Sequence, residues 1–180
     1  MPDVGFWVFG YGSLLWNPGF NPVEKRLARL RGYSRSFCMR SLHHRGTPER
    51  PGLVLALDER SGEHCDGMAF SAAPGESATV LRDLRERELI SDAYLERRVR
   101  IEFHDGGETT ALAFIVDPEH EQYCGELPIE AQVGIIASAH GGRGKNSEYL
   151  YRTSECLSLL GINDPLLDEL ADRVRALDGD

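Results

Sequence analysis

Long uncharged apolar runs are missing from this sequence. No window offers the roughly 18 uncharged apolar residues that a membrane-spanning helix requires. The first residues, Met1-Pro2-Asp3-Val4, also lack the basic segment that opens a signal peptide. We therefore expect a cytoplasmic protein with no membrane partner.

Basic residues are in short supply. The 180 residues include 20 Lys and Arg against 29 Asp and Glu, which gives a formal net charge of -9. A field of this sign repels the phosphate backbone of nucleic acids and the surface of anionic membranes. We expect no nucleic acid among the partners, and the sequence leaves protein partners open.

Metal-ligand and dithiol motifs are also missing. The four cysteines lie far apart and form no C-x-x-C pair, so neither a zinc ribbon nor a dithiol redox motif is present. The six histidines show no H-E-x-x-H spacing. The sequence therefore predicts no metal site and reduced thiols at Cys38, Cys65, Cys124 and Cys156.

Short strand-like runs fill the first two thirds of the chain, which we expect to form a single domain, residues 1–180. The last two runs flank Asp105-Gly106-Gly107, a hairpin signal. The expected strands are residues 5–9, 34–40, 53–57, 67–71, 99–104 and 110–116.

Helical patterns follow the strands. One spans residues 129–140 and stops at Gly141-Gly142. A second is expected to start with Asn146 as N-cap and to end at Gly161, and a third to start with Asp164 as N-cap and Pro165 as first helical residue. Strands first and helices last predict an α+β fold, with helices packed around a small closed sheet.

Residues 76–88 predict an amphipathic helix that separates two glutamates. At about 100° per residue, Glu88 falls in the apolar arc of the helix, whereas Glu86 lies nearly opposite. Burial of a carboxylate raises its pKa toward the range where a general base works at neutral pH. The wheel alone favours a second interpretation, in which Glu88 is solvated or paired with a neighbouring arginine in a frayed last turn. The arc is formed by Val80, Leu81 and Leu84.

A glycine-rich loop, residues 10–16 (GYGSLLW), follows the first strand. Leu15 stands where a dinucleotide fingerprint needs its third glycine and where a nucleophile elbow around Ser13 needs its second. Two interpretations remain: a turn whose successive backbone N–H groups form an anion-binding concavity, or an ordinary tight turn.

Four blocks of the sequence resemble those of the ChaC-type γ-glutamylcyclotransferases. They are residues 8–16 (VFGYGSLLW), residues 41–46 (SLHHRG) followed by Pro51-Gly52, residues 87–89 (REL) followed by Tyr94-Leu95, and residues 144–150 (GKNSEYL). The blocks come in the family's order and extend over residues 6 to 150. Chance similarity does not produce four ordered blocks.

The resemblance implies a small mixed β-barrel flanked by α-helices and an enzyme that converts glutathione to 5-oxoproline and cysteinylglycine. It implies no cofactor. It also implies that Glu88 is the catalytic acid and base, in agreement with the helical wheel.

The resemblance further points to the residues that hold the substrate. The loop is expected to bind the α-carboxylate of the γ-glutamyl group through backbone N–H groups and the Ser13 hydroxyl. Arg45 is a candidate for the glycine carboxylate or, equally, a surface arginine paired with an acid. Tyr149 lines the pocket or fills the core. The loop residues in question are Tyr11, Gly12, Ser13 and Leu14.

Two other function classes compete with this one. A non-catalytic regulator of a transporter would bind γ-glutamyl compounds in the same pocket, but binding alone needs no inward-facing base such as Glu88. A serine hydrolase built on Ser13 would need a correctly shaped elbow, and the missing glycine counts against it.

Overall fold

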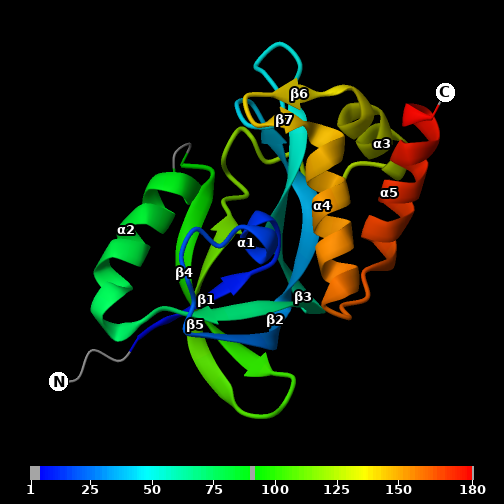
Figure 1. The fold of residues 1–180 in the computed structure, drawn as a ribbon. Coiled ribbons are helices and arrows are strands. Elements are labelled where there is room, and N and C mark those ends of the chain that lie inside the picture. The colour runs from blue at the N-terminus through cyan, green and yellow to red at the C-terminus, as the bar shows by residue number, and fades with distance from the viewer. Residues whose placement is uncertain (1–4, 90–91, 180) are drawn as a thin grey trace. The chain divides into compact units, whose positions relative to one another are not determined.

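The computed structural model describes residues 5–89 and 92–179 (Figure 1). The chain divides into two compact units, which we name the barrel unit (Met1–Arg35 and Leu57–His120) and the helical unit (Ser36–Ala56 and Glu121–Asp180). The expectation that residues 1–180 form a single domain stays a prediction.

In the described part of the chain, five strands form a closed barrel in the order β1-β3-β2-β4-β5, with an additional pairing between β3 and β5. β1 runs antiparallel to β3 and parallel to β5, so the barrel is mixed. The predicted small mixed barrel is confirmed. The strands are β1 (Trp7–Gly10), β2 (Glu24–Ser41), β3 (Gly52–Ser71), β4 (Tyr94–Phe103) and β5 (Glu108–Val116).

The predicted hairpin is the β4–β5 pair. Its register runs from Tyr94 opposite Val116 to Glu102 opposite Glu108. Gly106 and Gly107 make the turn with φ values of 106° and 88°, in the left-handed region that glycine adopts without a steric penalty. The hairpin is longer than the expected strands because β4 already begins at Tyr94.

Strands β2 and β3 are also longer than the sequence pattern predicts. The two strands expected at residues 53–57 and 67–71 are parts of the single strand β3, and the one expected at residues 34–40 is the last part of β2. The polar and mostly exposed residues 59–64 interrupt the apolar pattern. An antiparallel strand with one face in water continues through such residues, which explains why two predicted strands are one.

The amphipathic helix is present as α2 (Ser77–Glu88), after the short 3-10 helix η1 (Pro74–Glu76). Figure 1 shows α2 beside the strands of the barrel unit. Val80 and Leu84 are buried in a cluster with residues of β1, β5 and the short helix α1 (Ser13–Trp16), and Leu81 packs against it. Burying a side chain of this size contributes about 1.5–3 kcal/mol, so this face fixes the helix on the barrel.

The helical unit contains α3 (Ile129–Ser138), α4 (Asn146–Leu159) and α5 (Pro165–Asp178), which pack on one another (Figure 1). The predicted start of the last helix is confirmed: Pro165 is its first residue, and the Asp164 carboxylate accepts a hydrogen bond from the Leu167 N–H at 3.2 Å.

The predicted end of the first of these helices is wrong. Helix α3 stops at Ser138, and Ala139 has extended backbone angles (φ -79°, ψ 146°). His140 instead pairs with Lys145 in a two-stranded ladder of β6 (His140–Gly141) and β7 (Gly144–Lys145). The helical spacing of His140 is coincidental.

The prediction of Asn146 as an N-cap is also wrong. Asn146 is the first residue of α4, and its side chain makes no capping bond. Its Nδ2 donates to the Leu53 carbonyl oxygen at 2.8 Å, and its Oδ1 accepts from the Leu53 N–H at 2.8 Å. The side chain thus fastens the start of α4 to β3.

No helix within residues 5–89 and 92–179 is both long and apolar enough to cross a membrane. The same residues bring together no group of three or more His, Cys, Asp or Glu side chains that could hold a metal ion.

Candidate active site

The glycine loop after β1 contacts residues of β3 and β5. A side chain at Gly10 would lie 2.8 Å from the Phe70 ring and 3.2 Å from Leu14 Cβ, so only glycine fits there. The buried Tyr11 hydroxyl donates to the Phe114 carbonyl oxygen at 2.7 Å. The Tyr11 side chain is therefore an anchor of the loop, and contact of Tyr11 with a substrate stays a prediction.

Arg35 holds the same loop and was not among the predicted site residues. Its side chain is buried, and its Nε donates to the Tyr11 carbonyl oxygen at 2.8 Å. A second hydrogen bond joins its Nη2 to the Asp66 carbonyl oxygen. This buried cation stands directly behind the loop, where its charge favours an anion. The sequence pointed to Arg35 only as a basic residue inside the strand expected at residues 34–40.

The loop continues into the short helix α1, which starts at Ser13. Hydrogen bonds from the Leu15 N–H to the Gly12 carbonyl and from the Asn17 N–H to the Ser13 carbonyl, both 2.9 Å, close its turns. The first N–H groups of a helix have no acceptor within it. Anion binding by the backbone N–H groups of Ser13 and Leu14 stays a prediction.

Glu88 is the last residue of α2, and its side chain is 16% exposed. Glu86, two residues earlier, is exposed. The helical wheel is confirmed in this respect, because it predicted an inward Glu88 and an outward Glu86.

Arg87 joins Glu88 to the loop. Its Nε lies 3.3 Å from Glu88 Oε1, its Nη2 donates to the Ser13 hydroxyl at 3.1 Å, and its Nη1 donates to the Asn17 carbonyl oxygen at 2.6 Å. The pairing of Glu88 with a neighbouring arginine, one of the two predicted alternatives, is thus present together with its burial. Within the barrel unit, one guanidinium brings the predicted base and the predicted binding serine together.

Arg45 belongs to the helical unit and is not a surface arginine, since it is 5% exposed. The pairing with an acid that was the other part of this alternative is present, because its Nη1 lies 4.0 Å from Glu148 Oε2. Its Nη1 donates to the carbonyl oxygens of Arg143 at 3.0 Å and Lys145 at 3.2 Å. Burial lowers the pKa of its guanidinium from the usual value. These bonds hold the β6–β7 turn, and contact with a substrate carboxylate stays a prediction for Arg45.

Tyr149 lies in the same unit, with the Arg45 guanidinium 5.7 Å from the centre of its ring. Its hydroxyl accepts a hydrogen bond from the Leu55 N–H at 3.2 Å, and its ring meets Phe37 edge-on at 6.1 Å. Tyr149 therefore fills the core of the helical unit, and a further role in lining the pocket stays a prediction.

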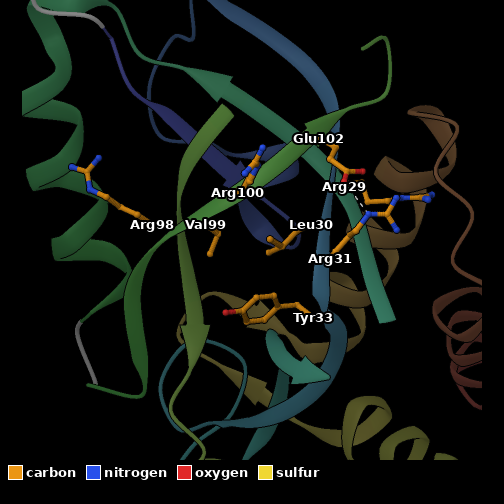
Figure 2. A pocket seen from close by; sticks show the side chains of 8 residues that line it. All are labelled: Arg29, Leu30, Arg31, Tyr33, Arg98, Val99, Arg100 and Glu102. Carbon is orange, nitrogen blue, oxygen red and sulfur yellow. Dashed lines mark hydrogen bonds and ion pairs between the residues drawn. The ribbon is translucent and has the colours of Figure 1, made fainter. Parts of the chain in front are cut away.

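A pocket of about 390 Å³ lies between β2 and β4 (Figure 2). Its carboxylate, Glu102, accepts a hydrogen bond from Arg31 at 2.9 Å, which lowers the pKa of Glu102. None of the described residues that line the pocket belongs to the glycine loop or to α2. We take the loop and Glu88 as the candidate site because Arg87 links the two. The described residues that line the pocket are Arg29, Leu30, Arg31, Tyr33, Arg98, Val99, Arg100 and Glu102.

The fold is that of the γ-glutamylcyclotransferases. The crystal structure of a γ-glutamyl cyclotransferase specific to glutathione from yeast matches with a TM-score of 0.87 and 22% sequence identity, covering 97% of each chain. YkqA from Bacillus subtilis matches with a TM-score of 0.57 and 19% identity, covering 95% of this chain and 54% of that one.

The chain belongs to the family of ChaC-like proteins, whose model matches residues 6–177. The glutathione-specific γ-glutamylcyclotransferase of Escherichia coli is 36% identical over 177 residues, which are 98% of this chain and 76% of that protein. The rat glutathione-specific γ-glutamylcyclotransferase 1 is 34% identical over 176 residues, 95% of this chain and 79% of that protein. The family prediction is confirmed, and the match extends beyond the four blocks into α5.

Proposed function

We propose that this protein is a cytoplasmic γ-glutamylcyclotransferase that acts on glutathione, with Glu88 as general base and then general acid. The observation that supports it best is the half-buried Glu88 carboxylate, linked through Arg87 to Ser13 of the glycine loop. The names of the relatives supply the substrate.

The proposed reaction is an intramolecular acyl transfer. The α-amine of the γ-glutamyl group, with a reference pKa of about 8, is largely protonated at neutral pH. Glu88 removes a proton from it, and the free nitrogen attacks the γ-carbonyl carbon to close a five-membered ring. The C–N bond to the cysteinyl residue then breaks, and the protonated Glu88 delivers its proton to the departing nitrogen. The second proton of the ring nitrogen passes to the released amine, which leaves as an ammonium, and the ring nitrogen keeps the single proton of a lactam.

The products are 5-oxoproline and cysteinylglycine, and Glu88 returns to its starting state. No oxidation state changes in this scheme, so the proposal includes no cofactor. Because nucleophile and carbonyl belong to one molecule, the orientation of the substrate decides the rate.

The loop supplies that orientation in our proposal. Backbone N–H groups of Gly12, Ser13 and Leu14, with the Ser13 hydroxyl, hold the α-carboxylate or the developing oxyanion. Tyr11 is proposed to contribute through its backbone N–H, because its hydroxyl and its carbonyl oxygen are bonded within the barrel unit. Arg45 is kept as the candidate for the glycine carboxylate of glutathione.

A product assay tests the proposed function. The purified protein, incubated with glutathione, is expected to release 5-oxoproline and cysteinylglycine in equal amounts. N-acetylated glutathione should be inert, because its nitrogen is no longer a nucleophile. Release of free glutamate would mean attack by water and would contradict cyclisation. Binding of glutathione without any product would favour a non-catalytic regulator.

Replacing Ser13 by alanine is expected to raise KM about tenfold and to change kcat less. The reason is that a hydroxyl bonded to the substrate carboxylate stabilises ground state and transition state alike. Steady-state kinetics of 5-oxoproline formation measure both constants. Complete loss of turnover at unchanged KM would instead point to Ser13 as a nucleophile.

A further inference from the structure

Arg87 contacts three groups of the candidate site at once. Adjacent residues on a helix do not normally face each other, yet the side chains of Arg87 and Glu88 meet at 3.3 Å. Arg87 also contacts Ser13, which belongs to the glycine loop, and Asn17, which directly follows α1. The Arg87 side chain is 16% exposed, so water screens these contacts little.

We infer that Arg87 is a positioning residue for the reaction proposed above. It fastens residues 13–17 to the end of α2 and so fixes the Glu88 carboxylate relative to the loop that holds the substrate. A planar guanidinium suits this role because its donors stand in a rigid fork. The inference rests on the proposed function and adds a residue to it.

Arg85 provides a matched control on the same helix. It lies in the same last turn of α2, and its Nε and Nη2 donate to the Glu96 carboxylate of β4 at 2.7 and 2.9 Å. Like Arg87, Arg85 pairs its guanidinium with a carboxylate, but the Arg85–Glu96 pair is exposed and joins α2 to the strand β4. Removing Arg85 therefore removes one positive charge and leaves the loop contacts in place.

The kinetic test compares three variants with the wild type. Arg87→Gln is expected to lower kcat about tenfold to a hundredfold, with a smaller change in KM, because a small misplacement of the reacting groups costs this much. Arg87→Lys keeps the charge but not the fork, so most of the loss should persist. Arg85→Gln should stay within twofold of wild type. A wild-type kcat in Arg87→Gln or Arg87→Lys would overturn the inference.

The pH dependence of kcat/KM is a second kinetic test. It would not change in Arg87→Gln if Arg87 only stabilised the fold. Losing the cation beside Glu88 disfavours its ionised form, so the acid limb of kcat/KM should shift to higher pH in Arg87→Gln. Glu86, which is exposed in the same turn, and the bonded Arg85–Glu96 pair keep their charges in this variant. An unshifted limb would count against Arg87 as the residue that faces the base.

Amide hydrogen exchange tests, without any turnover, whether Arg87 holds residues 13–17 to the end of α2. Residues 11–17 are expected to exchange about tenfold faster in Arg87→Gln than in the wild type, and at the wild-type rate in Arg85→Gln. Unchanged exchange in Arg87→Gln would overturn the inference and leave the proposed function standing. A wild type that forms no 5-oxoproline would instead overturn the proposed function, while the exchange rates still decide whether Arg87 holds the loop.

Discussion

Replacing Glu88 by glutamine is expected to lower kcat by about 10² to 10⁴, the usual contribution of a positioned general acid and base. Glutamine keeps the shape of the side chain and removes its capacity to accept a proton. Folding and glutathione binding should therefore persist. Steady-state kinetics of 5-oxoproline formation, together with calorimetric titration of glutathione, separate turnover from binding.

Glu86 is the matched control for Glu88. Both glutamates lie in the last turns of α2, but Glu86 is exposed, whereas Glu88 is half-buried beside Arg87. Glu86→Gln should therefore be close to wild type in both kcat and KM. An active Glu88→Gln enzyme, or a folded but inactive Glu86→Gln enzyme, would show that the base has been assigned to the wrong residue.

The pH profile of the wild type adds an independent test of Glu88. A base in the free enzyme makes kcat/KM fall on the acid side, where the carboxylate takes up a proton. The limb should vanish from the residual activity of Glu88→Gln. A wild-type rate independent of pH below neutrality would contradict a carboxylate base.

Local chemistry made much of the fold predictable. The turn at Gly106-Gly107 needs positive φ angles, and the start of α5 needs a cap and a proline, so both can be identified from neighbouring residues alone. The inward Glu88 followed from the helical period in the same way. The length of β3 was less accessible, since no local pattern shows that residues 59–64 belong to a continuous strand.

The parts of the site that were not predicted depend on contacts between residues far apart in the chain. Arg35 reaches the Tyr11 carbonyl across 24 positions, and Arg87 reaches the Ser13 hydroxyl across 74. Arginine side chains are mostly exposed in folded proteins, so a sequence pattern assigns both residues to an exposed face by default. Apart from the Glu88 carboxylate beside Arg87, the partners named above are backbone carbonyls and a hydroxyl, groups that leave no complementary charge in the sequence.

Asn146 is a residue of the helical unit whose long-range contact was likewise not predicted from the sequence. Its replacement is expected to have a large effect on the stability of the protein. Asparagine before a helical pattern is typical of an N-cap, yet here its amide completes the hydrogen bonding of the buried Leu53 backbone. Asn146→Ala would leave that N–H and carbonyl unpaired. We expect a loss of about 2–5 kcal/mol in the free energy of unfolding, measured by urea denaturation.

Two further variants decide whether the loss of stability in Asn146→Ala comes from the hydrogen bonds of Asn146. Asn146→Leu has a similar volume but no polar atoms, so it should destabilise the protein about as much as alanine does. Helix propensity is not the cause, because alanine and leucine are both better helix formers than asparagine. Asn163→Ala, at an exposed position, should change stability by less than about 0.5 kcal/mol. A leucine variant as stable as wild type would show that Asn146 acts by filling space, and the amide bridge between α4 and β3 would then contribute nothing measurable.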